Sequence, residues 1–169
     1  MAYRPIYLVE LVYPPTSDLG YTDASGLGSG GVWIDPNKDS KNYTWRVQWP
    51  SDITQDLVRF TNPEDTITNL DLELAALVFK EAVFGSISTP LACRTPTPGS
   101  NNTPIVVWTF HEASTINPVV ANLLSIRSAH NRLHNIAPSI FYHPGPLNTM
   151  ANGASLRFYL PPHPFLALF

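Results

Sequence analysis

Two acidic residues stand out by their surroundings. One lies just before a glycine turn, and the other lies in an apolar segment, where burying a carboxylate is costly. Asp23 ends an extended stretch just before Gly26, and Glu73 lies in the largely apolar segment 70–79, whose spacing is helical. A glutamate on an apolar helix face loses solvation unless a partner compensates for the burial. A hard divalent cation shared with Asp23 would be such a partner, since Mg²⁺ prefers carboxylate oxygens. Taken singly, Asp23 is a turn residue and Glu73 a partly exposed helix residue, so only the pair suggests this chemistry.

The elements that would position Asp23 form a meander near the start of the chain. Residues 21–24, 32–34 and 43–49 are rich in β-branched and aromatic side chains and are bounded by turn residues. The glycines of residues 26–31 predict a hairpin turn that needs flexible φ values. These patterns predict three consecutive antiparallel strands.

A helix that would carry Glu73 follows the meander. Thr68 and Asn69 are capping residues, and the run 74–79 is apolar on nearly every side, which predicts a central helix. Gly85 is expected to end this helix.

The rest of the chain alternates strands and helices, and with the meander the order is β-β-β-α-β-α-α-β-α, a mixed α/β domain. We expect an extended arm at 1–18, one domain at 19–158 and an apolar, proline-broken tail at 159–169. The later elements are predicted as a strand at 91–93, a loop at 95–100, a helix at about 104–110, a helix at about 118–134 capped by Asn117 or Ser114, a strand at 139–142 and a helix at about 148–158.

Four strings, in this order, resemble the active-site segments of one family. They are Tyr21–Gly26 (YTDASG), Thr68–Ala76 (TNLDLELAA), Ser100–Pro104 (SNNTP) and Pro144–Asn152 (PGPLNTMAN). From about residue 19 to 158 the chain resembles the ribonuclease H domain that follows reverse transcriptase in retroelement polyproteins. The resemblance implies an α/β, ribonuclease H-like fold: a five-stranded mixed sheet, with three antiparallel strands first, flanked by helices.

The same resemblance implies a set of site residues. Asp23 matches the aspartate of the first strand, Glu73 the helix glutamate, and His143 a histidine in the loop before the last segment. Asn101 and Asn152 stand where family members commonly carry aspartates. The implied catalytic residues are therefore Asp23, Glu73, Asn101, Asn152 and His143, and the first four are also the implied metal ligands.

The family activity is the hydrolysis of RNA in an RNA/DNA hybrid with Mg²⁺ or Mn²⁺. Such sites hold two divalent cations about 4 Å apart and need dense negative charge. Asn101 and Asn152 remove two of the four formal charges, and an amide oxygen does not replace an ionic charge. We therefore expect weakened cation binding and little or no cleavage.

No other acid is expected to take their place. Asp71 lies two residues from Glu73 and so points to another side of the helix. No Asp or Glu follows Glu112, which comes after the short helix expected at 104–110.

Three functions stay open at this point. The chain is an active or silenced retroelement ribonuclease H, a degenerate domain that binds a hybrid or another nucleic acid without cutting it, or a protein-interaction domain without a nucleic-acid role. Whether Asn101 and Asn152 are natural or engineered also stays open. The apolar run 165–169 is a possible contact for a protein partner.

Composition sets the broad limits. The chain has 169 residues, 44% of them hydrophobic, and a single cysteine, Cys93, which excludes an intramolecular disulfide. No membrane span or signal peptide is evident, so we expect an intracellular protein, cytoplasmic or nuclear.

The net charge of −3 conceals an asymmetry, because all thirteen acids lie at or before Glu112, whereas the only charged residues at 113–169 are three arginines. His130 and His134 have the spacing of a zinc pair, but no third ligand is evident nearby.

Overall fold

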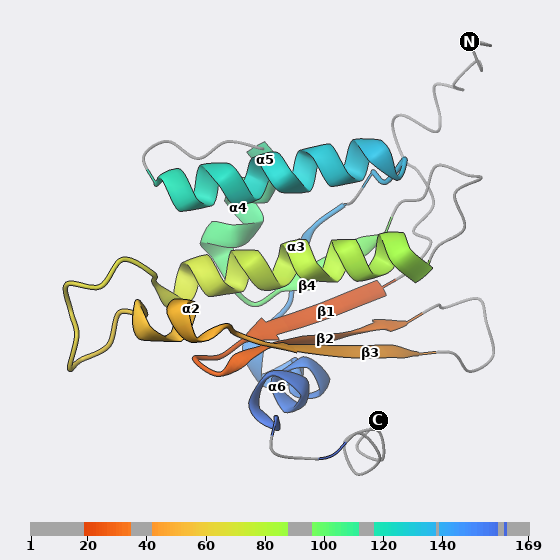
Figure 1. The fold of residues 1–169 in the computed structure, drawn as a ribbon. Helices are drawn as coiled ribbons and strands as arrows, with labels where there is room; N and C mark the ends of the chain where they lie inside the picture. Colours follow the sequence, from red (N-terminus) through yellow and green to blue (C-terminus); the bar gives the residue numbers. More distant parts are fainter. Residues whose placement is uncertain are drawn as a thin grey trace, which may run out of the picture.

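The computed structural model describes residues 19–34, 42–87, 96–111, 117–137, 139–158 and 161. The expected arm at 1–18 and nearly all of the tail at 159–169 lie outside these residues. Figure 1 shows a sheet with helices on both faces. The strands are β1 (Leu19–Ala24), β2 (Gly28–Ile34), β3 (Tyr43–Gln48), β4 (Thr97–Ser100) and β5 (Phe141–Tyr142). The helices are α2 (Ser51–Gln55), α3 (Asn69–Ile87), α4 (Thr103–His111), α5 (Pro118–Leu133) and α6 (Thr149–Leu156), with a 3₁₀ turn, η1 (Gly145–Leu147).

The five strands form one mixed sheet in the order β3-β2-β1-β4-β5. The first three strands are antiparallel neighbours, as the meander predicted, with Asp23 opposite Gly30. Strand β4 runs parallel to β1, and β5 runs parallel to β4. The predicted α/β fold with a five-stranded mixed sheet is confirmed.

Two layers cover one face of this sheet and one layer covers the other. Helix α3 packs on β1, with the Thr22 hydroxyl donating to the Ala76 carbonyl at 3.4 Å, and α5 lies over α3 on the side away from the sheet (Figure 1). Helix α6 lies on the opposite face, against β2 and β1. Leu74, Leu77, Val120 and Leu124 fill the space between α3 and α5.

The glycines of the first hairpin have a different role from the one predicted. Gly28, Gly30 and Gly31 lie inside β2, and no described glycine has a positive φ, so the expected turn over 26–31 is wrong beyond Leu27. A side chain at Gly30 would meet Ala154, its Cβ lying 2.5 Å from the Ala154 Cβ, and one at Gly28 would meet the ring of Phe158. Gly28 and Gly30 are therefore needed because α6 and the residues after it lie so close to the sheet, whereas a Cβ on Gly31 would meet the Tyr21 carbonyl and the Trp45 ring.

Two further boundaries differ from the prediction. Residues 97–100 form β4 and not a loop, although proline and glycine are depleted in strands. Residues 97–100 form a strand in spite of this composition because they are buried in the sheet, with Pro98 fully buried. The predicted strand at 91–93 falls outside the described residues. Helix α3 continues past Gly85 to Ile87, and a Cβ on Gly85 would lie 2.7 Å from the His130 ring, so this glycine permits close packing of α5.

The helix starts agree with the predicted capping residues. The Thr68 backbone N–H donates to the Asp71 carboxylate at 2.8 Å and the Asp71 N–H donates back to the Thr68 hydroxyl, an arrangement of the capping-box type. Asn117 caps α5, its side-chain oxygen accepting from the Val119 N–H at 2.9 Å. The Asn117 amide also donates to Asp71 at 3.1 Å, which ties the starts of α3 and α5 together.

Neither α2 nor the segment after it was predicted, and the last strand and helix are shorter than expected. Among the described residues, none of the helices is both long and apolar enough to cross a membrane.

Candidate functional site

Asp23 lies near the end of β1 and is held there by α6. Its side chain faces the same side of the sheet as Gly30, and the Ser155 hydroxyl donates to its Oδ2 atom at 2.5 Å. Ser155 is anchored in turn, because the Ser25 hydroxyl donates to its carbonyl at 2.7 Å. Burial raises the pKa of Asp23, and hydrogen bonds from Ser155, Asn101 and the Ala24 N–H oppose that rise.

Glu73 approaches the same strand end from α3. Its side chain is 6% exposed, and its Oε2 atom has no hydrogen-bond partner. Burial, together with the charge of Asp23, raises the pKa of Glu73 to about 8, against the opposing effects of the Ala24 N–H and Lys80. Glu73 is therefore largely protonated at neutral pH when no cation is bound, and the two carboxylates together carry less than two negative charges.

The two asparagines both lie close to Gly145, the first residue of the 3₁₀ turn. Asn101 directly follows β4, and its side chain opposes the rise in the pKa of Asp23. Asn152 lies on α6, where its amide nitrogen is 3.5 Å from the Gly145 carbonyl oxygen. A Cβ on Gly145 would lie 3.4 Å from the Asn101 amide nitrogen, so both asparagines adjoin this glycine.

Three oxygen atoms of this cluster are buried acceptors without a hydrogen-bond partner: Glu73 Oε2, Asn101 Oδ1 and Asn152 Oδ1. Unsatisfied buried acceptors are costly, and such oxygens are the ligands that Mg²⁺ and Mn²⁺ take. The residues therefore fit one weakly held divalent cation. They do not fit two, because two carboxylates supply at most two negative charges against the four positive charges of two divalent cations.

No additional acid completes the cluster among the described residues. The spacing predicted that Asp71 points to another side of the helix than Glu73, and the structure places it in the α3 cap, where it accepts from Thr68. Glu112 falls outside the described part of the chain. Within that part, no three Asp, Glu, His or Cys side chains are grouped so that they could hold a metal ion.

His143 lies beside this cluster, against an aromatic neighbour. Its ring centroid is 4.7 Å from that of Tyr21, which precedes Asp23 by two residues and so faces the same side of β1. Its backbone N–H donates to the Ser100 carbonyl at 2.8 Å. The other predicted pair, His130 and His134, stack at 4.3 Å between ring centroids, and no third ligand joins them among the described residues.

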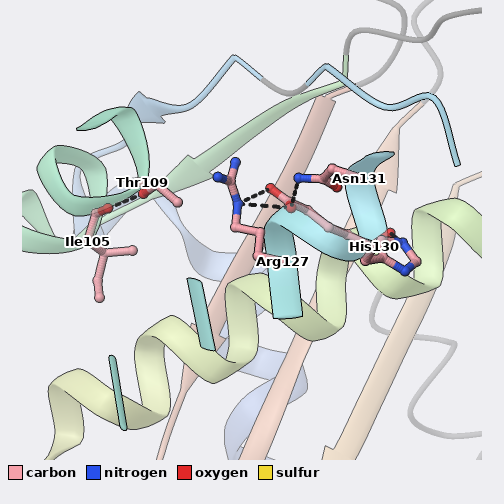
Figure 2. A network of polar contacts seen from close by, with 6 residues as sticks. Ile105, Thr109, Arg127, His130 and Asn131 are labelled. Atoms are coloured by element: carbon pink, nitrogen blue, oxygen red, sulfur yellow. Dashed lines mark hydrogen bonds and ion pairs between the residues drawn. The ribbon is translucent and has the colours of Figure 1, made fainter. Parts of the chain in front are cut away.

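Sequence reasoning missed Ser155 and a buried polar network between α3 and α5. The Arg127 guanidinium contacts the Glu81 carboxylate at 2.9 Å, and the Asn131 amide donates to the same carboxylate at 2.9 Å (Figure 2). Figure 2 shows the side chains of Arg127 and Asn131 reaching this carboxylate from one helix. Lys80 is fully buried and donates to the Gly99 carbonyl at 3.0 Å, one residue before Ser100. The available signal was the pair Lys80–Glu81 within the otherwise apolar stretch 74–85 of α3.

Solved structures with a similar fold are known. No protein-family model matches the sequence, and no curated protein is significantly similar to it. The structure is similar to that of RNase H1 from the halophilic archaeon Halobacterium salinarum NRC-1, with a TM-score of 0.57 and 12% identity over 81% of this chain and 92% of the other. It is also similar to LC11-RNase H1 in complex with an RNA/DNA hybrid, with a TM-score of 0.60, 15% identity and the same coverage.

A third similar structure is the N-terminal RNase H domain of rv2228c from Mycobacterium tuberculosis, with a TM-score of 0.55 and 11% identity over 81% of this chain and 94% of that one. At these identities the similarity concerns the fold. The chain has a ribonuclease H-like fold.

Proposed function

We propose that this domain binds nucleic acid, an RNA/DNA hybrid in the first place, without cleaving it. The binding site is the sheet end where Asp23, Glu73, Asn101 and Asn152 gather. The observation that carries the proposal is the composition of this cluster: it has two carboxylates, not four, and two amides whose oxygens are buried without partners. This cluster retains ligands for a cation but lacks the charge that a two-cation hydrolytic site needs.

The fold supports the nucleic-acid part of the proposal. The structurally similar proteins are RNase H1 domains, one of them solved with an RNA/DNA hybrid. Asp23 and Glu73 would hold one Mg²⁺ or Mn²⁺, with the amide oxygens of Asn101 and Asn152 beside it. Mg²⁺ in proteins is commonly held by one or two carboxylates together with phosphate oxygens, so the cation would supply positive charge for a backbone phosphate.

The proposal includes an origin and a location. The strings around Glu73 and Asn152 support descent from the ribonuclease H domain of a retroelement reverse transcriptase, with the loss of two aspartates. An intracellular location, cytoplasmic or nuclear, would suit a nucleic-acid ligand. If this origin is right, the parent gene should encode polymerase motifs upstream of this domain. Related copies of the gene should carry Asp codons at positions 101 and 152.

The direct test is fluorescence anisotropy with a labelled RNA/DNA hybrid and a DNA duplex of the same sequence, in Mg²⁺ and in EDTA. We expect hybrid binding in Mg²⁺ that weakens about tenfold or more in EDTA, and the same loss on Asp23→Asn. Asp52→Asn, the same substitution at an exposed acid on α2, serves as the control and should bind like the wild type. Binding should also weaken as salt rises, because phosphate contacts release counterions.

Gel analysis of the same hybrid tests the absence of cleavage. We expect intact RNA with either Mg²⁺ or Mn²⁺. Robust cleavage that Asp23→Asn abolishes would contradict the inactive assignment. Failure to bind the hybrid or any other nucleic acid at low salt, by a folded protein, would contradict the proposal as a whole.

A further inference from the structure

The segment between α2 and α3 presents one aromatic side chain entirely to solvent. Residues 56–67, here called the Phe60 loop, are held by backbone hydrogen bonds, with Arg59 and Asn62 exchanging both of theirs at 3.2 and 3.0 Å. This exchange places Phe60 in a tight turn, and its side chain is 103% exposed. Val58, on the same loop, is 37% exposed. The base of the loop is fixed, since Leu57 and Ile67 pack in the cluster that contains Ala24.

An exposed phenylalanine on an ordered turn is a typical anchor for a protein interface, because aromatic side chains bury much area at little conformational cost. The charge around it indicates the kind of partner. The Phe60 loop contains three acids (Asp56, Glu64 and Asp65) against one base, Arg59, whose guanidinium donates to the Thr54 carbonyl at 3.0 Å. Its net charge of −2 repels phosphate and favours a basic, apolar protein surface.

A surface of that kind lies on the outer side of α5. Its buried residues, among them Val120, Leu124 and Arg127, face α3 and the core. Figure 1 shows α5 as the outermost helix, on the side of α3 away from the sheet, with the Phe60 loop beyond the start of α3. The large apolar residues exposed on α5 are Val119, Ile126 and Leu133, spaced seven residues apart and 38%, 56% and 78% exposed.

The chemistry of this helix surface complements the Phe60 loop. Ala129 and Arg132 lie between Ile126 and Leu133 in sequence and are exposed, so a small side chain and a guanidinium adjoin the apolar residues. No acidic residue occurs anywhere from residue 113 onward. The outer side of α5 therefore combines apolar side chains with one exposed arginine and no acid, and the Phe60 loop combines apolar side chains with an excess of acids.

We propose that the Phe60 loop of one molecule docks on the outer side of α5 of a second copy, with Phe60 against Ile126, Ala129 and Leu133 and the loop acids near Arg132. The two surfaces are different patches of one chain, so the contact is head-to-tail and leaves one patch of each kind open at the ends. Association then continues beyond a dimer unless the rotation closes a ring. This inference does not depend on the proposed nucleic-acid function.

Sedimentation velocity of the wild-type protein, from about 10 µM to about 1 mM, is the first test. We expect the average mass to rise with concentration past that of a dimer, and to fall when salt screens the charges. Phe60→Ser and Ile126→Asp should each weaken association about tenfold or more. Phe110→Ser removes an aromatic side chain that is 75% exposed on α4 and should leave association unchanged.

Mixing the two defective variants is the decisive experiment. Phe60→Ser keeps an intact α5 surface and Ile126→Asp keeps an intact Phe60 loop, so an equimolar mixture should form a 1:1 dimer that grows no further. Circular dichroism and thermal melting of each variant establish that both are folded.

Three outcomes overturn the proposal. They are a wild-type protein that stays monomeric over the whole concentration range, association that strengthens with salt, and folded variants that form no mixed dimer. In the first of these cases, the loop has another role if Phe60→Ser also weakens oligonucleotide binding by the folded monomer. The Phe60 side chain then contacts nucleic acid and not a second copy.

Discussion

Gly30 lies directly opposite Asp23 across β1 and β2, and its lack of a side chain allows α6 to bring Ser155 within 2.5 Å of the Asp23 carboxylate. A Cβ at position 30 would come within 2.7 Å of the backbone of Ala154. The environment of Asp23 thus depends on a residue of the neighbouring strand that has no functional group of its own.

Gly30→Ala should therefore lower the free energy of unfolding by about 1–3 kcal/mol, because α6 must move away from the sheet. Urea denaturation would measure this loss. Gly26→Ala is the matched control, since its Cβ would meet only the end of the flexible Leu57 side chain, at 3.3 Å. Equal stability of the two variants would contradict the packing role given to Gly30.

Ser155→Ala removes the hydrogen bond that most opposes the rise in the pKa of Asp23. We expect a further rise of that pKa, followed by NMR titration of the carboxyl carbon, and a loss of about 1–3 kcal/mol near pH 7. The sign follows from linkage: a raised carboxyl pKa means that the folded state binds more protons, so stability falls as pH rises through the titration. Ser86→Ala is the control, because the Ser86 hydroxyl is exposed and donates only within its own helix. An unchanged pKa of Asp23 would contradict the assigned contact.

Restoring the two absent carboxylates should restore cation affinity. Asn101→Asp with Asn152→Asp places four acids at the sheet end, which should lower the stability of the cation-free protein and raise its affinity for Mg²⁺ by at least about tenfold. Calorimetric titration and melting with and without Mg²⁺ measure the two effects. Asn62→Asp, in the Phe60 loop, is the control for an added charge. Unchanged Mg²⁺ binding would show that the cluster lacks ligand geometry as well as charge.

The buried pair of Glu81 and Arg127 gives a separate stability prediction. Arg127→Met leaves the Glu81 carboxylate buried with only the Asn131 amide beside it, and should cost about 3–5 kcal/mol. Glu81→Met combined with Arg127→Met removes both charges and should cost less than Arg127→Met alone. Arg132→Met, at an exposed position on the same helix, should change stability by less than about 0.5 kcal/mol. Chemical denaturation ranks the variants, and a double variant less stable than Arg127→Met would contradict the pairing.

Lys80 predicts how stability depends on alkaline pH. Burial and, less strongly, Arg127 lower the pKa of Lys80 to about 7, against the opposing charges of Glu81 and Glu73. The folded state then binds fewer protons than the unfolded state between about pH 7 and the usual lysine pKa of 10.5, so this group makes stability rise with pH over that window. Lys80→Met should flatten that rise, which denaturation at pH 7, 8.5 and 10 would show. An identical slope in the variant would contradict a shifted lysine.

The sequence predicted the secondary structure best where the local pattern and the packing of the folded chain favour the same element. The caps at Thr68 and Asn117 and the alternation of 43–48 correctly predicted where elements begin and how the first strands pair. It was misleading where burial overrode composition: Pro98 lies within β4, and Gly30 serves helix packing and not a turn. The approach of Ser155 to Asp23 spans 132 residues of sequence. No periodicity encodes such a contact, so only the folded chain shows it.

The same long separation bears on how the protein is made. The Asn148 amide donates to the Thr22 carbonyl at 2.9 Å and the Ser25 hydroxyl donates to the Ser155 carbonyl, so α6 is tied to the first strand by contacts that span 126 to 130 residues. Domains emerge from the ribosome N-terminus first, so Asp23 is synthesised long before the residues that surround it. During translation the face of β1 and β2 that α6 covers stays open, and a nascent chain stalled before residue 148 would present it to chaperones.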